Sequence, residues 1–118
     1  MPYLSLVTIA IPEDSDHEVN LFRAVDPECR ISIMGDIKYI EYDYTQWYLE
    51  SPCDPILAVM SYLEGLGREN YAFIRLGELH EDCTYMGDTV RFGISIDARI
   101  IITAYHHKIK SKPSTMEI

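Results

Sequence analysis

The residues of this sequence that are best suited to chemistry lie close together, between Glu78 and Cys83. His80 and Cys83 are three positions apart, and this spacing could place both side chains on one metal ion in a turn. A structural zinc site usually needs four ligands, and only His106-His107 could supply a second pair. The loop therefore indicates a solvated turn more strongly than a metal site, and we expect no cofactor.

The same loop could hold a cysteine nucleophile with a histidine base. Three acidic residues, Glu78, Glu81 and Asp82, lie beside Cys83, and negative charge disfavours the thiolate on which cysteine reactivity depends. The other acids form no motif that singles out a catalytic pair. An alternative hypothesis is a small enzyme or metal-binding protein that uses this loop together with His106 or His107. The sequence favours a protein that is not an enzyme.

The chain is strongly acidic, with 19 Asp and Glu residues against 10 Lys and Arg residues and a formal net charge of -9. An acidic surface repels nucleic acid and anionic lipid and attracts basic protein surfaces. The only basic stripe is Lys108, Lys110 and Lys112, near the C-terminus. The charge therefore argues against direct binding of nucleic acid or membrane and favours a basic protein partner, in particular one that handles nucleic acid.

The run from Glu41 to Glu50 combines aromatic rings with acids and contains no positive charge. Tyrosine and tryptophan anchor many protein interfaces, and acids between them attract a partner rich in Arg and Lys. The same rings could instead form an aromatic corner that packs the helix expected at 54–65 onto the sheet. We favour the interface. The residues expected to contact a partner are Glu41, Asp43, Tyr44, Trp47, Tyr48 and Glu50, followed by Glu78, Glu81 and Asp82.

A β-hairpin is the clearest local structure that the sequence predicts. Two β-type runs within 29–44 flank Gly35-Asp36, a pair suited to a two-residue turn. This register pairs Met34 with Ile37 and Arg30 with Glu41. It places Cys29, Ile31, Ile33, Ile40 and Tyr42 on a core side, and Ser32, Tyr39, Arg30 and Glu41 on a solvent side.

The remaining patterns predict an α+β fold. Strands are expected at 3–11 and 70–76, a short helix ending before Pro27, and a longer helix capped by Asp54 and Pro55. Residues 77–88 read as polar turns, and 89–103 as one long alternating strand that could break near Asp97-Ala98. The result is a mainly antiparallel sheet with two helices on one face and an extra C-terminal strand. The element order is compatible with a ferredoxin-like β-α-β-β-α-β domain.

The length of 118 residues and the ordinary share of hydrophobic and charged residues are typical of a single small domain. We expect residues 1–105 to form it and 106–118 to be a flexible basic tail. Three cysteines are an odd number for a disulfide framework, and no apolar run approaches the roughly 20 residues that span a bilayer. No signal-peptide pattern precedes the first strand. These features predict a cytoplasmic protein.

The leading hypothesis is a small binding protein that blocks or regulates a basic partner by occluding its surface. Immunity proteins that neutralise nuclease toxins act on such surfaces, as do phage inhibitors of bacterial defence, including anti-CRISPR proteins that imitate nucleic acid. A third hypothesis is a structural homo-oligomer, such as a homodimer, in which a strand at 90–102 lies at a sheet edge and pairs with a second copy.

Overall fold

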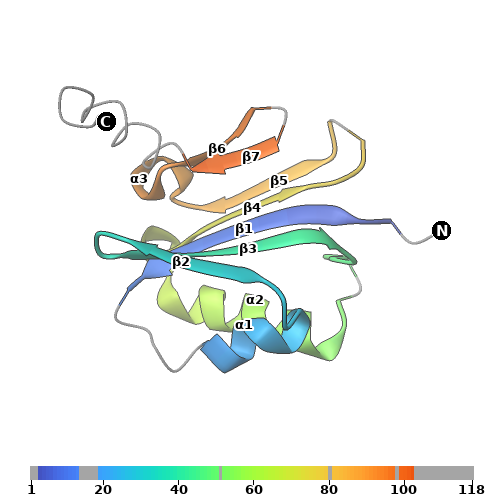
Figure 1. Ribbon diagram of the computed structural model, residues 1–118, viewed down its shortest axis with the longest axis horizontal. Helices are drawn as coiled ribbons and strands as arrows, with labels where there is room; N and C mark the ends of the chain where they lie inside the picture. Colours follow the sequence, from blue (N-terminus) through green and yellow to red (C-terminus); the bar gives the residue numbers. More distant parts are fainter. Residues whose placement is uncertain (1–2, 14–18, 51, 80, 98, 103–118) are drawn as a thin grey trace.

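The protein was analysed as a computed structural model that describes residues 3–13, 19–50, 52–79, 81–97 and 99–102. Its main feature is a five-stranded sheet in the order β2-β3-β1-β4-β5, in which all neighbours are antiparallel (Figure 1). The elements in chain order are β1 (Ser5–Pro12), α1 (Val19–Val25), β2 (Arg30–Met34), β3 (Ile37–Thr45), α2 (Asp54–Leu66), the 3₁₀ turn η2 (Arg68–Asn70), β4 (Ala72–Leu76), β5 (Cys83–Gly87), α3 (Thr89–Phe92), β6 (Ile94–Asp97) and β7 (Arg99–Ile102).

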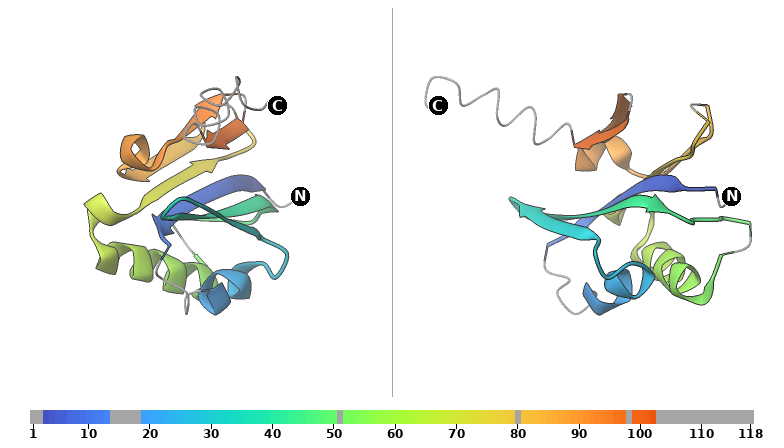
Figure 2. Two further views of the ribbon diagram at one scale, coloured as in Figure 1. Left: turned by 60° about the vertical axis from the view of Figure 1, so that its left-hand side comes forward. Right: turned by 45° about the vertical axis from the view of Figure 1, so that its right-hand side comes forward.

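Three layers make up the fold. The helices α1 and α2 cover one face of the sheet, and the hairpin β6–β7 with α3 covers the other, as both views in Figure 2 also show. Each face has its own hydrophobic core. The predicted α+β class, with two helices on one face of an antiparallel sheet, is therefore confirmed, and the ferredoxin-like assignment stays a prediction.

The hairpin β2–β3 has the predicted register. Met34 pairs with Ile37 and Arg30 with Glu41, around Gly35 at φ 66°. The prediction that Tyr39 lies on the solvent side is wrong. Tyr39 is buried and donates its hydroxyl to the carbonyl oxygen of Phe92 at 2.9 Å. The second face of the sheet is covered by α3 and the β6–β7 hairpin, which the local alternation of β2 and β3 does not reveal.

Helix α2 also forms where the sequence predicts it. Cys53, not Asp54, is the N-cap residue, and the helix begins with Asp54-Pro55. Ile56, Val59 and Leu63 form its buried stripe against the sheet.

The prediction of one long strand at 89–103 is wrong. Asp88 accepts a hydrogen bond from the backbone nitrogen of Arg91 and so caps the short helix α3, which Gly93 ends at φ 70°. Val90, the first apolar residue of the expected alternation, is 90% exposed. The expected division of this segment into two strands is confirmed, because β6 ends at Asp97, β7 begins at Arg99, and the two pair with each other. The polar segment 77–88 contains the unpredicted edge strand β5.

The predicted tail, 106–118, lies outside the described residues. No helix in the described part of the chain is long and apolar enough to cross a membrane.

Candidate functional site

A β-bulge interrupts β3 near its end. Ser5 pairs with Thr45 and Val7 pairs with Tyr42, so that two residues of β3, Asp43 and Tyr44, lie opposite the single residue between Ser5 and Val7. The extra residue changes the side to which the following side chains point. The bulge therefore places Asp43 and Tyr44 next to each other at the surface.

Tyr44 adopts a left-handed backbone conformation with φ 54°, and no other described non-glycine residue has a positive φ. This conformation costs a bulky residue about 1–2 kcal/mol, because its Cβ crowds the following carbonyl oxygen. The ring gains little burial in return, since Tyr44 is 70% exposed. Backbone strain of this kind is concentrated at functional sites in proteins.

The bulge and the loop that follows divide the aromatic run 41–50 between interior and surface. Trp47 is 1% exposed and packs between Tyr42 and Phe73, with ring centroids 5.1 and 5.8 Å away. Tyr42 donates its hydroxyl to the carbonyl oxygen of Phe22 at 2.8 Å, and burial raises the pKa of this phenol. The expectation that Trp47 is a surface anchor is therefore wrong, because the core between sheet and helices takes the ring.

A cleft lies beside Tyr44 on the face that carries the β6–β7 hairpin. Its volume is about 580 Å³, within the range of ligand-binding sites. Strands β1, β2, β3 and β7 contribute to its lining. The lining residues are Leu6, Thr8, Arg30, Glu41, Tyr42, Asp43, Tyr44 and Ile100.

Arg30 connects the two predicted acids of this cleft. Its guanidinium donates a hydrogen bond to Asp43, and it lies 3.7 Å from the carboxylate of Glu41. The hydrogen bond to Asp43 is the main cause that raises the pKa of Arg30, against the opposing effect of burial. Two carboxylates share one cation, so the cleft keeps an excess negative charge.

A second hollow, of about 670 Å³, lies on the other side of Tyr44. Asp26, Gln46 and Tyr48 are among its lining residues, together with Cys53 at the start of α2. Tyr44 lines both hollows and therefore forms the ridge between them. We call Asp26, Asp43, Tyr44, Gln46 and Tyr48 the Tyr44 surface.

The second predicted group of acids, Glu78, Glu81 and Asp82, has a largely structural role. Asp82 forms an ion pair with the buried Arg75 at 2.7 Å. The hydrogen bonds from Arg75 and then Tyr3 hold the pKa of Asp82 below its usual range. Glu78 accepts a hydrogen bond from the backbone nitrogen of Leu4 at 2.7 Å, and Glu81 is exposed.

Tyr3 joins the two predicted groups. Its hydroxyl donates to Asp82 at 2.6 Å, and its backbone nitrogen donates to the hydroxyl of Tyr48 at 3.2 Å. Sequence reasoning missed this link, and it missed Arg75 and the apolar lining of the cleft. The signal for Arg75 was available, because a single cation inside the apolar strand Ala72–Leu76 requires a partner when it is buried.

The groups that an enzyme or a metal site would use are only partly within the described residues. No group of three or more His, Cys, Asp or Glu side chains in this part of the chain could hold a metal ion. Cys53 and Cys83 are exposed, and burial raises the pKa of the Cys29 thiol. The histidines of the alternative hypothesis, at 80, 106 and 107, lie outside the described residues.

Tyr44→Gly tests the strain directly. Glycine adopts φ 54° without steric cost, so the free energy of unfolding should stay level or rise by up to about 1 kcal/mol. Tyr48→Gly is the matched control and should lower it, because Tyr48 has no positive φ to relieve and its hydroxyl accepts the bond from Tyr3. Urea unfolding measures both, and a loss of more than about 1 kcal/mol in Tyr44→Gly contradicts the strain.

The arrangement presents acids and tyrosine rings outward around two hollows, and this chemistry suits the binding of a cationic surface. A comparison of the chain with protein-family models, curated proteins and solved structures finds no match.

Proposed function

We propose that this protein binds a basic macromolecular partner through the Tyr44 surface and blocks or regulates it by occlusion. The observation that carries the proposal is Tyr44 itself, a strained and exposed aromatic residue between two hollows. A ring that contributes little to the core and costs backbone strain is explained when it contacts another molecule.

The distribution of charge supports a basic partner. Of the cations in the described part of the chain, Lys38 and Arg75 are buried and Arg30 is paired with two acids, whereas Arg23, Arg68 and Arg91 are exposed. The acids are mostly at the surface, among them Asp43 on the Tyr44 surface. Carboxylates placed in this way can occupy positions that phosphates take on a nucleic-acid-handling protein. Immunity proteins to nuclease toxins and phage inhibitors of bacterial defence exemplify this mode of inhibition.

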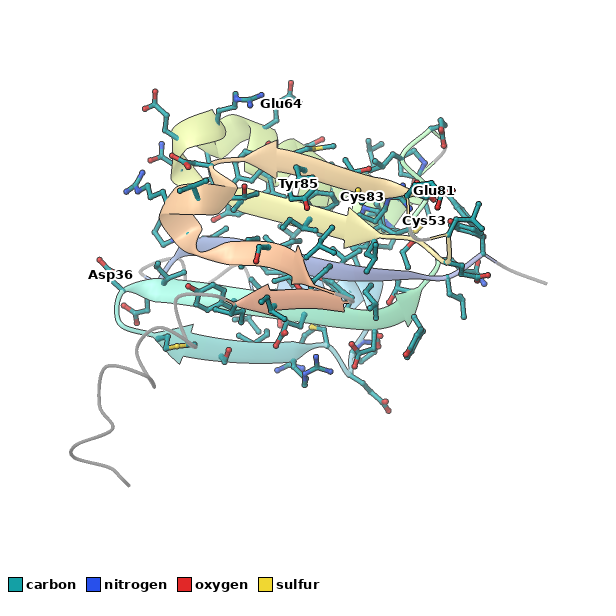
Figure 3. All side chains as sticks on the ribbon, turned by 90° about the horizontal axis from the view of Figure 1, so that it is seen from above. Asp36, Cys53, Glu64, Glu81, Cys83 and Tyr85 are labelled. Atoms are coloured by element: carbon teal, nitrogen blue, oxygen red, sulfur yellow. The ribbon has the colours of Figure 1, made fainter. Side chains whose placement is uncertain are left out.

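A pair of double variants tests the proposal. Asp43→Lys with Tyr44→Ala reverses one charge and removes one ring on the Tyr44 surface. Glu64→Lys with Tyr85→Ala makes the same kinds of change elsewhere. Glu64 lies in the last turn of α2, and Cys53, which lines the second hollow, precedes the first turn of the same helix (Figure 3). Tyr85 is an exposed ring on β5, at the opposite edge of the sheet from β2.

The immobilised proteins would be compared by capture from a cell extract, with quantitative mass spectrometry. We expect a basic protein on the wild type, reduced at least about 10-fold by the first pair and less than about 2-fold by the second. Raising the salt concentration or adding duplex DNA should release it, because both screen or compete for its cationic surface. Equal capture by both pairs of variants contradicts the proposal.

A further inference from the structure

Glu41 has an unusual position among the acids of the cleft. Its side chain is only 24% exposed, so its carboxylate has lost much of its water. Among the described residues its one charged partner is Arg30, at 3.7 Å, which is longer than a normal hydrogen bond. Arg30 instead donates its direct hydrogen bond to Asp43. Because a carboxylate can accept about four hydrogen bonds, Glu41 can accept more donors than its long contact with Arg30 supplies.

The rest of the cleft suits a long cationic side chain. Leu6 and Ile100 provide apolar surface against which a methylene stem can pack. Tyr44 lies at the edge of the same cleft with most of its ring exposed, where a cation can stack on it. The cleft thus joins a partly dehydrated carboxylate, apolar surface and an aromatic face.

Arg30 shows which cation these acids accept. Its guanidinium already lies between Glu41 and Asp43, and its side chain is 56% exposed. A planar guanidinium can donate to two carboxylates at once and can stack on a ring, whereas an ammonium is a compact, strongly hydrated charge. The cleft is therefore better matched to arginine than to lysine.

We infer that the cleft is a receptor for an arginine side chain of the basic partner, with Glu41 as the main acceptor of its guanidinium. This inference rests on the proposed function, because Asp43 and Tyr44 belong to both the cleft and the Tyr44 surface. In the complex the incoming guanidinium bonds Glu41, Tyr44 covers it, and Arg30 stays on Asp43.

Three short peptides of the form acetyl-Gly-Ser-X-Ser-Gly-amide, with arginine, lysine or citrulline at X, provide the probe. Binding would be followed by NMR titration of the full chain. We expect the arginine peptide to bind at least about 5-fold more tightly than the lysine peptide, and citrulline to bind most weakly. The largest shifts should lie at Thr8 and Ile100, and not at Asp36 in the distant β2–β3 turn (Figure 3).

Glu41→Gln keeps the shape of the side chain and removes its charge, and Glu64→Gln makes the same change far from the cleft. Glu41→Gln should abolish the preference for arginine over lysine, whereas Glu64→Gln should keep it. Arg30→Gln should strengthen arginine binding at least about 3-fold, because it removes the competing guanidinium. Equal affinity for arginine and lysine in the wild type, or the same preference after Glu41→Gln, overturns the inference.

The failure of this inference can be told apart from the failure of the proposed function. If capture of the partner depends on Asp43 and Tyr44 while the peptides show no arginine preference, the arginine receptor is wrong and the binding function stands. If Glu41→Gln removes a clear preference for arginine while Asp43→Lys with Tyr44→Ala leaves capture of the partner unchanged, the arginine receptor stands and the proposed function is wrong.

Discussion

Replacing Trp47 by alanine is expected to lower the free energy of unfolding by about 3–5 kcal/mol, the largest effect of any single change in the aromatic run. The ring is 1% exposed and fills the space between Tyr42 and Phe73 in the core beneath the sheet. Truncation of the side chain leaves a cavity between Tyr42 of β3 and Phe73 of β4. Denaturant unfolding followed by circular dichroism measures the loss.

Two further variants distinguish packing from hydrogen bonding at this position. Trp47→Phe should lower the free energy of unfolding much less, because the indole nitrogen Nε1 has no hydrogen-bond partner among the described residues. Tyr44→Ala should change stability by less than about 1 kcal/mol, because that ring is mostly exposed. A loss under about 1 kcal/mol for Trp47→Ala contradicts the position of the ring in the core.

Asp82→Ala is expected to lower the free energy of unfolding by about 2–3 kcal/mol, since it leaves the buried guanidinium of Arg75 without its charge partner. The Nε atom of Arg75 already lacks a partner among the described residues, and only the hydroxyls of Ser5 and Thr84 remain for its other nitrogens. Glu81→Ala, one residue away and exposed, should stay within about 0.5 kcal/mol.

The same ion pair predicts a pH dependence. The pKa of Asp82 is lower in the folded chain than in the unfolded chain, because Arg75 and Tyr3 hydrogen-bond its charged form. Its contribution is therefore complete above the unfolded pKa, near pH 4, and is lost as the pH falls through the folded pKa. Wild-type stability should fall more steeply than that of Asp82→Ala in acid. Parallel curves contradict the assignment.

The parts of the fold that sequence reasoning predicted are those fixed by neighbouring residues. The Gly35-Asp36 turn sets the register of β2 and β3, and the alternation of their side chains agrees with it. Helix α2 is specified in the same local way, by Pro55 near its start and the apolar stripe along one side.

The predictions that are wrong concern residues whose position depends on contacts with distant parts of the chain, or on a helix too short to show a pattern. Tyr39 reads as a solvent-side residue until the β6–β7 hairpin covers the second face. For α3 a local signal existed, because Asp88 and Gly93 are suitable capping residues, but four residues are too few for a helical period to compete with the longer alternation.

The candidate site was predictable in composition and not in geometry. Acids and tyrosines in 41–50 stand out in the sequence, and Asp43, Tyr44 and Tyr48 do reach the surface. The bulge that exposes Tyr44 has no sequence signal, because the left-handed position carries tyrosine where glycine is usual. The burial of Trp47 was not predictable either, because its ring packs on Phe73 of β4, which is distant in the chain.

If Tyr44 is held outward in order to contact another molecule, Tyr44→Gly should weaken binding of the partner without weakening the fold. With the captured partner in hand, isothermal calorimetry should show affinity at least about 10-fold below wild type in a variant that unfolds no more easily. Wild-type affinity in Tyr44→Gly would contradict the claim, because the strained ring would then make no contact in the complex.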